Sequence, residues 1–372
     1  MSTSSAKENI MEEYVREKNL YTHLSASVLQ IMEGLMKKEG IRCASAGYRI
    51  KDADSLEEKI GRKEDKYKSL SDITDIGGVR IITYYADDVD RVAELIEREF
   101  EVDRENSIDK RKTLEPNVFG YLSLHYVISL DERRAKLPEY SNLEGLKIEV
   151  QIRSILQHSW AEMEHDMGYK SKIEVPKEIV RDFSRLAGLL EIADKEFQEI
   201  RQRISKYELD VSKKLQNDGQ EEEVSLDAIS LQVLLDTDEA FIALNKAIEE
   251  RTGIKIGSSE NANYQTILNE FQWLGITTIG GAKRLLEEKK DLAVSLAGEN
   301  LSREKNKSLL KTIGLFYLCY AILVEEYPEQ RWIDYLRDNH LGDVDEADEF
   351  VEKLSKIYRK ISDRRKKQSS RV

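Results

Sequence analysis

The sequence predicts an α+β protein, in which a mixed β-sheet domain flanked by helices is followed by an all-α carboxy-terminal domain. Runs with apolar residues at every second position, typical of half-buried strands, fall within residues 41–170. Apolar residues with helical spacing surround these runs and fill almost everything after residue 227. The chain has 372 residues, enough for two domains that each bury a core.

We expect four segments along the chain. They are an amino-terminal helical segment 1–40, a sheet domain with its carboxy-terminal flanking helices 41–215, a linker 216–227 and a helical domain 228–372. The linker is predicted because its sequence, QNDGQEEEVSLD, is polar, acidic and contains glycine.

The first elements alternate between helix and strand. Helical spacing over about 6–38 ends at Gly40, and CASAGYRIKD is a predicted strand. Ser55 and Glu58 form the spacing of a capping box that opens a helix. Two glycines, at 77 and 78, then introduce a strand up to residue 85, and Asp88 can cap the next helix.

Two further alternating strands are predicted in YLSLHYVISL and LKIEVQIR. Ser154 with Gln157 can cap the helix that follows the second one. From Glu178 to about Leu215 the spacing is helical, and we expect its apolar stripe to pack on the sheet. The stripe consists of Ile179, Phe183, Leu186, Leu190, Ile192 and Phe197.

Composition excludes several classes of protein. Hydrophobic residues make up 40% and charged residues 35%, which indicates a folded, soluble protein. The net charge of −13 disfavours a general nucleic-acid-binding surface, so no DNA partner is expected. Cys43 and Cys319 are too far apart for a CxxC metal site, which fits a reducing cytoplasm. We expect no membrane span, because the most apolar segment, 313–327, is shorter than the roughly 20 residues required.

One predicted strand carries a polar face. Side chains alternate along a strand, so Ile148, Val150 and Ile152 turn to the core while Lys147, Glu149, Gln151 and Arg153 share the other face. In GYLSLHYVISL the same alternation groups Tyr121, Ser123 and His125. An ordinary solvated sheet face is the alternative interpretation of the first strand.

Basic residues gather in one part of this acidic chain. Arg49 and Lys51 share a strand face, and the next helix places Lys59, Arg62, Lys63 and Lys66 on one side. This pattern favours an anion site, although a charge run on a helix is often only a solvated face.

Carboxylates in two predicted strands could hold a divalent cation. Asp75 precedes the paired glycines, Arg80 follows within the strand, and Glu149 lies on the polar face described above. Mg²⁺ prefers such hard oxygen ligands, so Asp75 and Glu149 are the predicted pair; Asp75 could also simply terminate a turn. A zinc site at His158, Glu162 and His165 is disfavoured, because the spacing is not HExxH.

Five ordered motifs together resemble the synthetase domain of the RelA/SpoT family of alarmone synthetases, over about residues 45–172. They are RIKDADSLEEK, DITDIGGVRI, GYLSLHY, IEVQIRS and WAEMEHDMGYK. The resemblance implies a nucleotidyltransferase-like sheet domain and a magnesium-dependent enzyme. In that family the β,γ-pyrophosphate of ATP moves onto the ribose 3′-hydroxyl of GDP or GTP, which releases AMP and makes (p)ppGpp.

The resemblance also implies roles for individual residues. Asp75 and Glu149 become the magnesium site, with Glu149 as the base for the 3′-hydroxyl, and Tyr121 stacks on the acceptor guanine. The residues implied at the ATP phosphates are Arg49, Lys51, Lys59, Arg62, Lys63 and Arg80. Those implied on the acceptor side, besides Tyr121, are Ser123, His125, Gln151, Arg153 and His165.

The identity of the acceptor substrate stays open, because Leu122 stands where the family motif GYRSxH has arginine. Toxic members of the family pyrophosphorylate the tRNA 3′ end, and here the domain from 228 could be a fused neutralising or regulatory module. The net charge gives no support for tRNA binding. A non-catalytic nucleotide-binding regulator is the third possibility.

We expect no alarmone hydrolase, since a hydrolase domain of about 150 residues does not fit before Arg49. The sequence gives neither the oligomeric state nor a ligand or partner of the carboxy-terminal domain.

Overall fold

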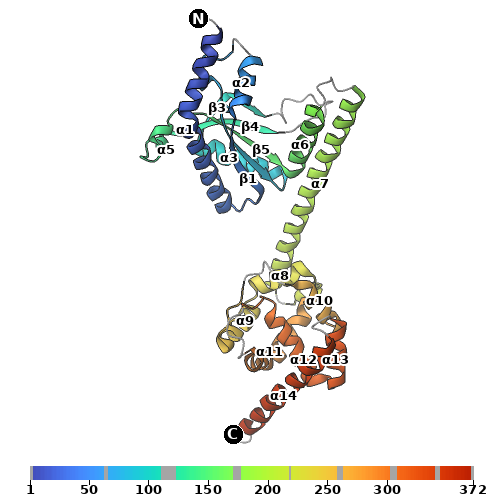
Figure 1. Cartoon of the computed structure of the whole chain (residues 1–372). Coiled ribbons are helices and arrows are strands. Elements are labelled where there is room, and N and C mark those ends of the chain that lie inside the picture. Colours follow the sequence, from blue (N-terminus) through green and yellow to red (C-terminus); the bar gives the residue numbers. More distant parts are fainter. Residues whose placement is uncertain are drawn as a thin grey trace. The chain divides into compact units, whose positions relative to one another are not determined.

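The chain forms two compact units, residues 1–202 and 203–372. The structure is a computed structural model that describes residues 3–62, 66–109, 123–170, 177–217, 219–257, 263–301, 308–339 and 344–369 (Figure 1). The division falls within helix α7 (Lys177–Leu215), before the predicted linker 216–227. Val224 of that segment is buried in the core of the second unit, where its carbonyl accepts from the Ile279 amide at 2.9 Å.

A five-stranded mixed sheet forms the centre of the first unit. Its strand order is β1-β2-β5-β4-β3, with β2 and β5 parallel and the other neighbours antiparallel. The strands are β1 (Cys43–Ile50), β2 (Gly77–Thr83), β3 (Phe100–Asp109), β4 (Leu124–Leu130) and β5 (Ile148–Ser154). The predicted α+β fold class is confirmed.

Helices α1 (Thr3–Lys38) and α3 (Ala86–Glu99) cover one face of this sheet (Figure 1). Ile148, Val150 and Ile152 alternate along β5 and are fully buried in the same core as the apolar side of α1 and α3. The short helices of this unit are α2 (Ala53–Arg62), α5 (Glu132–Ala135), η1 (Leu70–Asp72) and η2 (Ser141–Leu143). Alternation of apolar residues therefore sets which face of the sheet is left for polar side chains.

Of the three helix caps predicted from the sequence, one is correct and two are wrong. Ser154 and Gln157 form the predicted capping box at α6 (Ile155–Lys170), with backbone-to-side-chain distances of 3.0 and 3.1 Å. The predicted cap at Ser55 is wrong, because the Asp52 carboxylate accepts from the Ser55 amide at 2.8 Å and α2 starts earlier. The predicted cap at Asp88 is also wrong, since α3 starts at residue 86 and Asp88 is buried beside Arg201.

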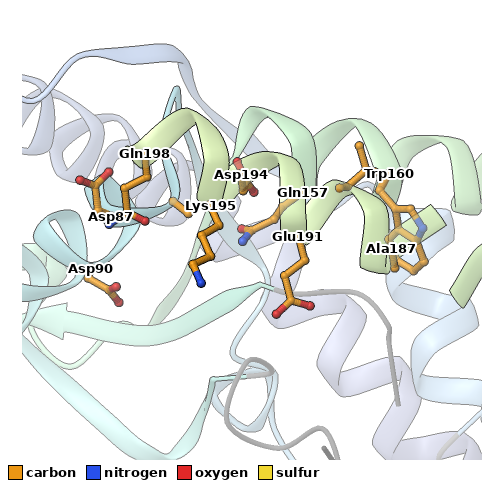
Figure 2. A pocket seen from close by; sticks show the side chains of 11 residues that line it. Asp87, Asp90, Gln157, Trp160, Ala187, Glu191, Asp194, Lys195 and Gln198 are labelled. Atoms are coloured by element: carbon orange, nitrogen blue, oxygen red, sulfur yellow. The ribbon is translucent and has the colours of Figure 1, made fainter. Parts of the chain in front are cut away.

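The prediction that the apolar stripe of α7 packs on the sheet is wrong. Ile179, Leu186, Ile192 and Phe197 are between 45 and 61% exposed. The side of α7 that meets the rest of the unit carries Asp194 and its neighbours, which line a cavity of about 340 Å³ with α3 and α6 (Figure 2). A helix has several faces, and here the more polar one contacts the protein.

The second unit is all-helical in its described residues, as predicted. It contains α8 (Ala228–Thr237), α9 (Glu239–Thr252), α10 (Tyr264–Trp273), α11 (Ile279–Leu301), α12 (Ile313–Glu326), α13 (Glu329–Asp338) and α14 (Val344–Ser369), with the short η3 (Glu221–Glu223). Helix α12 is the apolar segment seen in the sequence, and its Leu315, Leu318 and Ala321 are fully buried. Across the described parts of both units, no helix combines the length and apolar composition needed to cross a membrane.

Candidate active site

Strand pairing brings the predicted polar residues into rows on one face of the sheet. Arg49 of β1 pairs with Gly78 of β2, which pairs with Glu149 of β5. In the next row on the same face Arg80 pairs with Gln151, which pairs with His125 of β4. Because directly paired residues point to the same side of a sheet, these side chains gather above its centre.

A cavity of about 400 Å³ lies over these rows. Its lining includes Arg49, Asp75, Arg80, Glu149 and Gln151. Gly78 also lines it, and the missing side chain there leaves room between the strands. The two carboxylates predicted to share a metal therefore face one space.

Asp75 is held at the turn before β2 by two lysines. Lys59 Nζ lies 2.7 Å from Oδ1 and Lys51 Nζ lies 3.3 Å from Oδ2. Oδ1 is shielded from solvent and has no partner in hydrogen-bond geometry, so its contact with Lys59 is an ion pair only. The two ion pairs hold the Asp75 carboxylate at the cavity, where it offers hard oxygen ligands.

Glu149 has both carboxylate oxygens occupied. His125 Nδ1 lies 2.7 Å from Oε1, and since a carboxylate can only accept, the ring N–H is the donor. Gln151 Nε2 donates to Oε2 at 2.7 Å. Burial would raise the pKa of Glu149, but the hydrogen bond and charge of His125, helped by Gln151 and Lys59, outweigh it and lower that pKa. Glu149 is therefore ionised and fixed in orientation.

Arg49 and Arg80 line the cavity, Arg153 lies beside Gln151, and the three arginines differ in their contacts. Arg80 forms an ion pair with Glu162 at 3.0 Å, and the buried Arg153 donates to Gln151 Oε1 at 3.2 Å. Burial, together with the positive charges of Arg80 and Arg49, lowers the pKa of Arg153 to about 10. Arg49 is exposed and has no hydrogen bond or ion pair with the described residues. It is therefore a cation available to an anionic ligand.

The remaining predicted residues do not all reach the cavity. Ser123 is fully buried, and its hydroxyl has no hydrogen-bond partner within the described chain. Arg62 is 68% exposed and pairs with Glu58, and His165 is exposed on α6; neither lines the cavity. The predictions for Lys63 and Tyr121 fall outside the described residues, as does Leu122.

One lining residue was considered in the sequence only as a zinc ligand. His158 of α6 lines the cavity, and its Nδ1 lies 3.7 Å from Glu162 Oε1. Glu162 is also paired with Arg80, and no group of three or more His, Cys, Asp or Glu side chains suited to a metal occurs in the described ranges. The structure thus lends the zinc alternative no support. The sequence could not predict that His158 lines the cavity, because this depends on how α6 packs against the sheet.

The site fits Mg²⁺ better than it fits a softer metal. Asp75 and Glu149 offer hard carboxylate oxygens at the same cavity. Mg²⁺ is commonly held by one or two carboxylates, with water and substrate phosphates completing its shell. Two carboxylates beside an open cavity are such a partial set.

Residues 48–174 match the family model described as "Region found in RelA / SpoT proteins", and the chain belongs to the RelA/SpoT family. It is 30% identical over 159 residues to GTP pyrophosphokinase YwaC of Bacillus subtilis (strain 168), which covers 42% of this chain and 72% of that relative. It is 27% identical over 176 residues to GTP pyrophosphokinase YjbM of the same organism, covering 46% and 79%. The crystal structure of small alarmone synthetase 2 from Bacillus subtilis has 26% identity and a TM-score of 0.44, and covers 51% of this chain and 99% of that chain. The predicted family is confirmed.

Proposed function

We propose that this chain is a pyrophosphokinase that makes (p)ppGpp from ATP and GDP or GTP. The 3′-oxygen of the acceptor ribose forms a bond to the β-phosphorus of ATP. The bond from that phosphorus to the α,β-bridging oxygen breaks, AMP leaves with the bridging oxygen, and the proton of the 3′-hydroxyl is lost. The curated relatives named GTP pyrophosphokinases support the reaction class.

One observation carries the assignment of the site: two carboxylates and an available cation line the same cavity. Arg49, Asp75 and Glu149 come from β1, the turn before β2 and β5, and they face one space of about 400 Å³. Transfer of a phosphoryl or pyrophosphoryl group depends on charge neutralisation and in-line positioning more than on covalent catalysis. A cavity with this charge pattern suits that demand.

The basic residues bind the triphosphate in this proposal. Arg49 needs no rearrangement, since it has no ion pair to break within the described chain. Lys51 and Lys59 already lie at the cavity edge, held by Asp75, and Arg80 is positioned by Glu162. Arg62 is outside the cavity, so we assign it no direct role, and Lys63 keeps the role of a helper that the resemblance implies.

Asp75 and Glu149 would hold Mg²⁺, which when bound neutralises phosphate charge and makes the β-phosphorus more electrophilic. Glu149 accepts the proton of the 3′-hydroxyl. His125 and Gln151 keep its carboxylate in one orientation, as their 2.7 Å hydrogen bonds indicate. Gln151 is in turn fixed by Arg153. Tyr121 keeps the acceptor-side role that the resemblance implies, whereas Ser123 and His165, like Arg62, do not line the cavity and receive no direct role.

Transfer of label from ATP tests this proposal and separates it from its rivals. ATP labelled in its β- and γ-phosphates is incubated with the full chain, Mg²⁺ and one acceptor: GDP, GTP or deacylated tRNA. We expect label on GDP or GTP. Label on tRNA alone would replace the proposal by the toxic-family alternative. Nucleotide binding without transfer to any acceptor would favour the non-catalytic regulator.

A further inference from the structure

A buried tyrosine of α1 holds the main chain between β1 and α2. The hydroxyl of Tyr14 donates a hydrogen bond to the carbonyl oxygen of Lys51 at 2.6 Å. Tyr14 is 2% exposed, and its ring belongs to the core of the sheet unit. A phenylalanine ring would fill the same space, so the hydroxyl adds this one directed contact.

The main chain of Lys51 is held at both of its hydrogen-bonding groups. Its amide donates to the carbonyl of Ile76 at 2.8 Å, which continues the pairing of β1 with β2 beyond Ile50. Its carbonyl accepts from Tyr14. The side chain then extends across the start of β2, where Nζ lies 3.3 Å from Asp75 Oδ2. The backbone contacts of Lys51 therefore set where its ammonium group lies.

Helix α1 lies against β1 and β2 and is itself held close to the candidate active site (Figure 1). Glu13, the residue before Tyr14, accepts from the Leu70 amide at 2.8 Å in the segment that leads to β2. Further along α1, a β-carbon on Gly77 would lie only 2.4 Å from Ser25 Oγ, so helix and strand are in close contact. These contacts give Tyr14 a fixed position relative to the strands that carry the site.

Tyr14 acts at a distance from the ligand. It does not line the candidate active-site cavity, so its effect must pass through Lys51. A lysine side chain has a flexible four-carbon stem, and a fixed main chain reduces the positions that its ammonium group can take. A cation that is already in place loses less conformational entropy when it binds a phosphate group than a mobile one does.

We propose that Tyr14 is a positioning residue for ATP: its hydroxyl fixes the main chain of Lys51 and thereby places the Lys51 ammonium for the triphosphate. The inference rests on the proposed function, in which Lys51 binds that triphosphate. Removal of the hydroxyl leaves the ring packing in place but takes away the donor to the Lys51 carbonyl. Affinity for ATP should fall as a result.

Isothermal titration of the full chain with α,β-methylene-ATP and Mg²⁺ tests the proposal. In this analogue carbon replaces the oxygen that leaves with AMP, so the ligand binds without reacting. We expect Tyr14→Phe to raise the Kd about 3–10-fold, as the loss of one hydrogen bond implies. Tyr21→Phe is the matched control and should stay within about twofold of the wild-type Kd. Tyr21 is also on α1 and 2% exposed, but its hydroxyl has no hydrogen-bond partner in the described chain.

A double-mutant cycle shows whether Tyr14 acts through Lys51. In a Lys51→Ala background, Tyr14→Phe should change the Kd by less than about twofold, because the side chain that the hydroxyl positions is gone. Far-UV circular dichroism and the urea midpoint check that each variant is folded. A Tyr14→Phe variant with the wild-type Kd overturns the proposal. An equal effect of Tyr14→Phe with and without the Lys51 side chain also overturns it, since the hydroxyl would then support only the fold.

Pyrophosphate transfer by the wild-type chain, measured on the same samples, separates this inference from the proposed function. Wild-type chain that binds the analogue but transfers nothing to GDP or GTP contradicts the proposed function, while the Kd values still decide the role of Tyr14. Wild-type chain that does not bind the analogue overturns both.

Discussion

Burial of Glu270 makes the stability of the helical unit depend on pH. Glu270 lies in α10 and is fully buried, with its Oε2 accepting a hydrogen bond from the Tyr335 hydroxyl and its Oε1 without a partner in the described chain. Burial raises its pKa to about 8, although the hydrogen bonds of Tyr335 and Cys319 act in the opposite direction. The folded unit therefore holds a proton that the unfolded chain loses.

The direction and size of the effect follow from this shift. Below pH 4.5, the ordinary pKa, Glu270 is protonated in both states and its contribution is fully present. Between about 4.5 and 8 the unfolded state binds fewer protons, so the free energy of unfolding falls by about 1.4 kcal/mol per pH unit. Above 8 the carboxylate is ionised in both states. The total loss is about 5 kcal/mol, as an upper estimate.

Urea unfolding at pH 5 and pH 8.5 measures this loss of stability. The chain has three tryptophans, and in a Trp160→Phe background fluorescence reports on Trp273 and Trp332 of the helical unit alone. Glu270→Gln cannot ionise, so its free energy of unfolding should not fall with pH through this group. The difference in free energy of unfolding between the variant and its parent should therefore shift by about 3–5 kcal/mol in favour of the variant from pH 5 to pH 8.5, independently of any constant effect of the amide. The exposed Glu352→Gln should behave as the parent. A Glu270→Gln variant whose pH dependence equals that of its parent would refute the reasoning.

Three further changes have defined outcomes. Arg49→Ala should lower kcat/KM for ATP by about 10–100-fold while Arg62→Ala stays within about twofold, because only Arg49 lines the cavity; equal losses in steady-state kinetics would contradict the site. Gly77→Ala should lower the free energy of unfolding by about 1–3 kcal/mol, since a β-carbon there would overlap side chains of α1 and β5, and an unchanged urea midpoint would count against the packing. Ser154→Ala should cost about 2–4 kcal/mol, because Ser154 caps α6 and donates to the buried Asp194 at 2.6 Å; a loss under about 0.5 kcal/mol in urea unfolding would show that neither contact matters.

Alternation and helical spacing predicted most elements of the sheet unit, because β2, β4 and β5 each bury an apolar face and β1 half-buries Cys43, Ala46 and Ile50 against the same core. Strand β3 was missed. Its sequence FEVDRENSID is dominated by polar residues, and it lies at the edge of the sheet, where one side has no neighbour to demand apolar contact. Hydrogen bonding to β4, which the sequence does not display, makes it a strand.

Periodicity also says which side of a helix is apolar without saying what covers it. Most residues of the predicted stripe on α7 share one side of the helix, but Ile192 does not. The prediction that the stripe packs on the sheet is wrong, because Asp194 and its neighbours face α3 and α6 instead. The same limit applies at helix starts. Asp52 and Ser55 are both good capping residues, and only the backbone path decides between them.

For the candidate site, the sequence predicts which side chains share one face of a strand, but it does not predict which strands are adjacent in the sheet. Alternation placed Glu149 and Gln151 on one face, and the structure agrees. That β2 and β5 are adjacent and parallel, which brings Asp75 near Glu149, depends on tertiary topology. His158 reaches the cavity from α6 for the same reason.

Pyrophosphate transfer by Glu149→Gln tests the central claim most directly. The amide keeps the size of Glu149 but cannot hold a cation or accept the 3′-hydroxyl proton, so label transfer from ATP to GDP or GTP should fall by about 10³-fold or more. The urea midpoint should change little, and Glu101→Gln, on the exposed edge strand β3, should keep full activity. Transfer by Glu149→Gln within about tenfold of the wild-type rate would contradict the account.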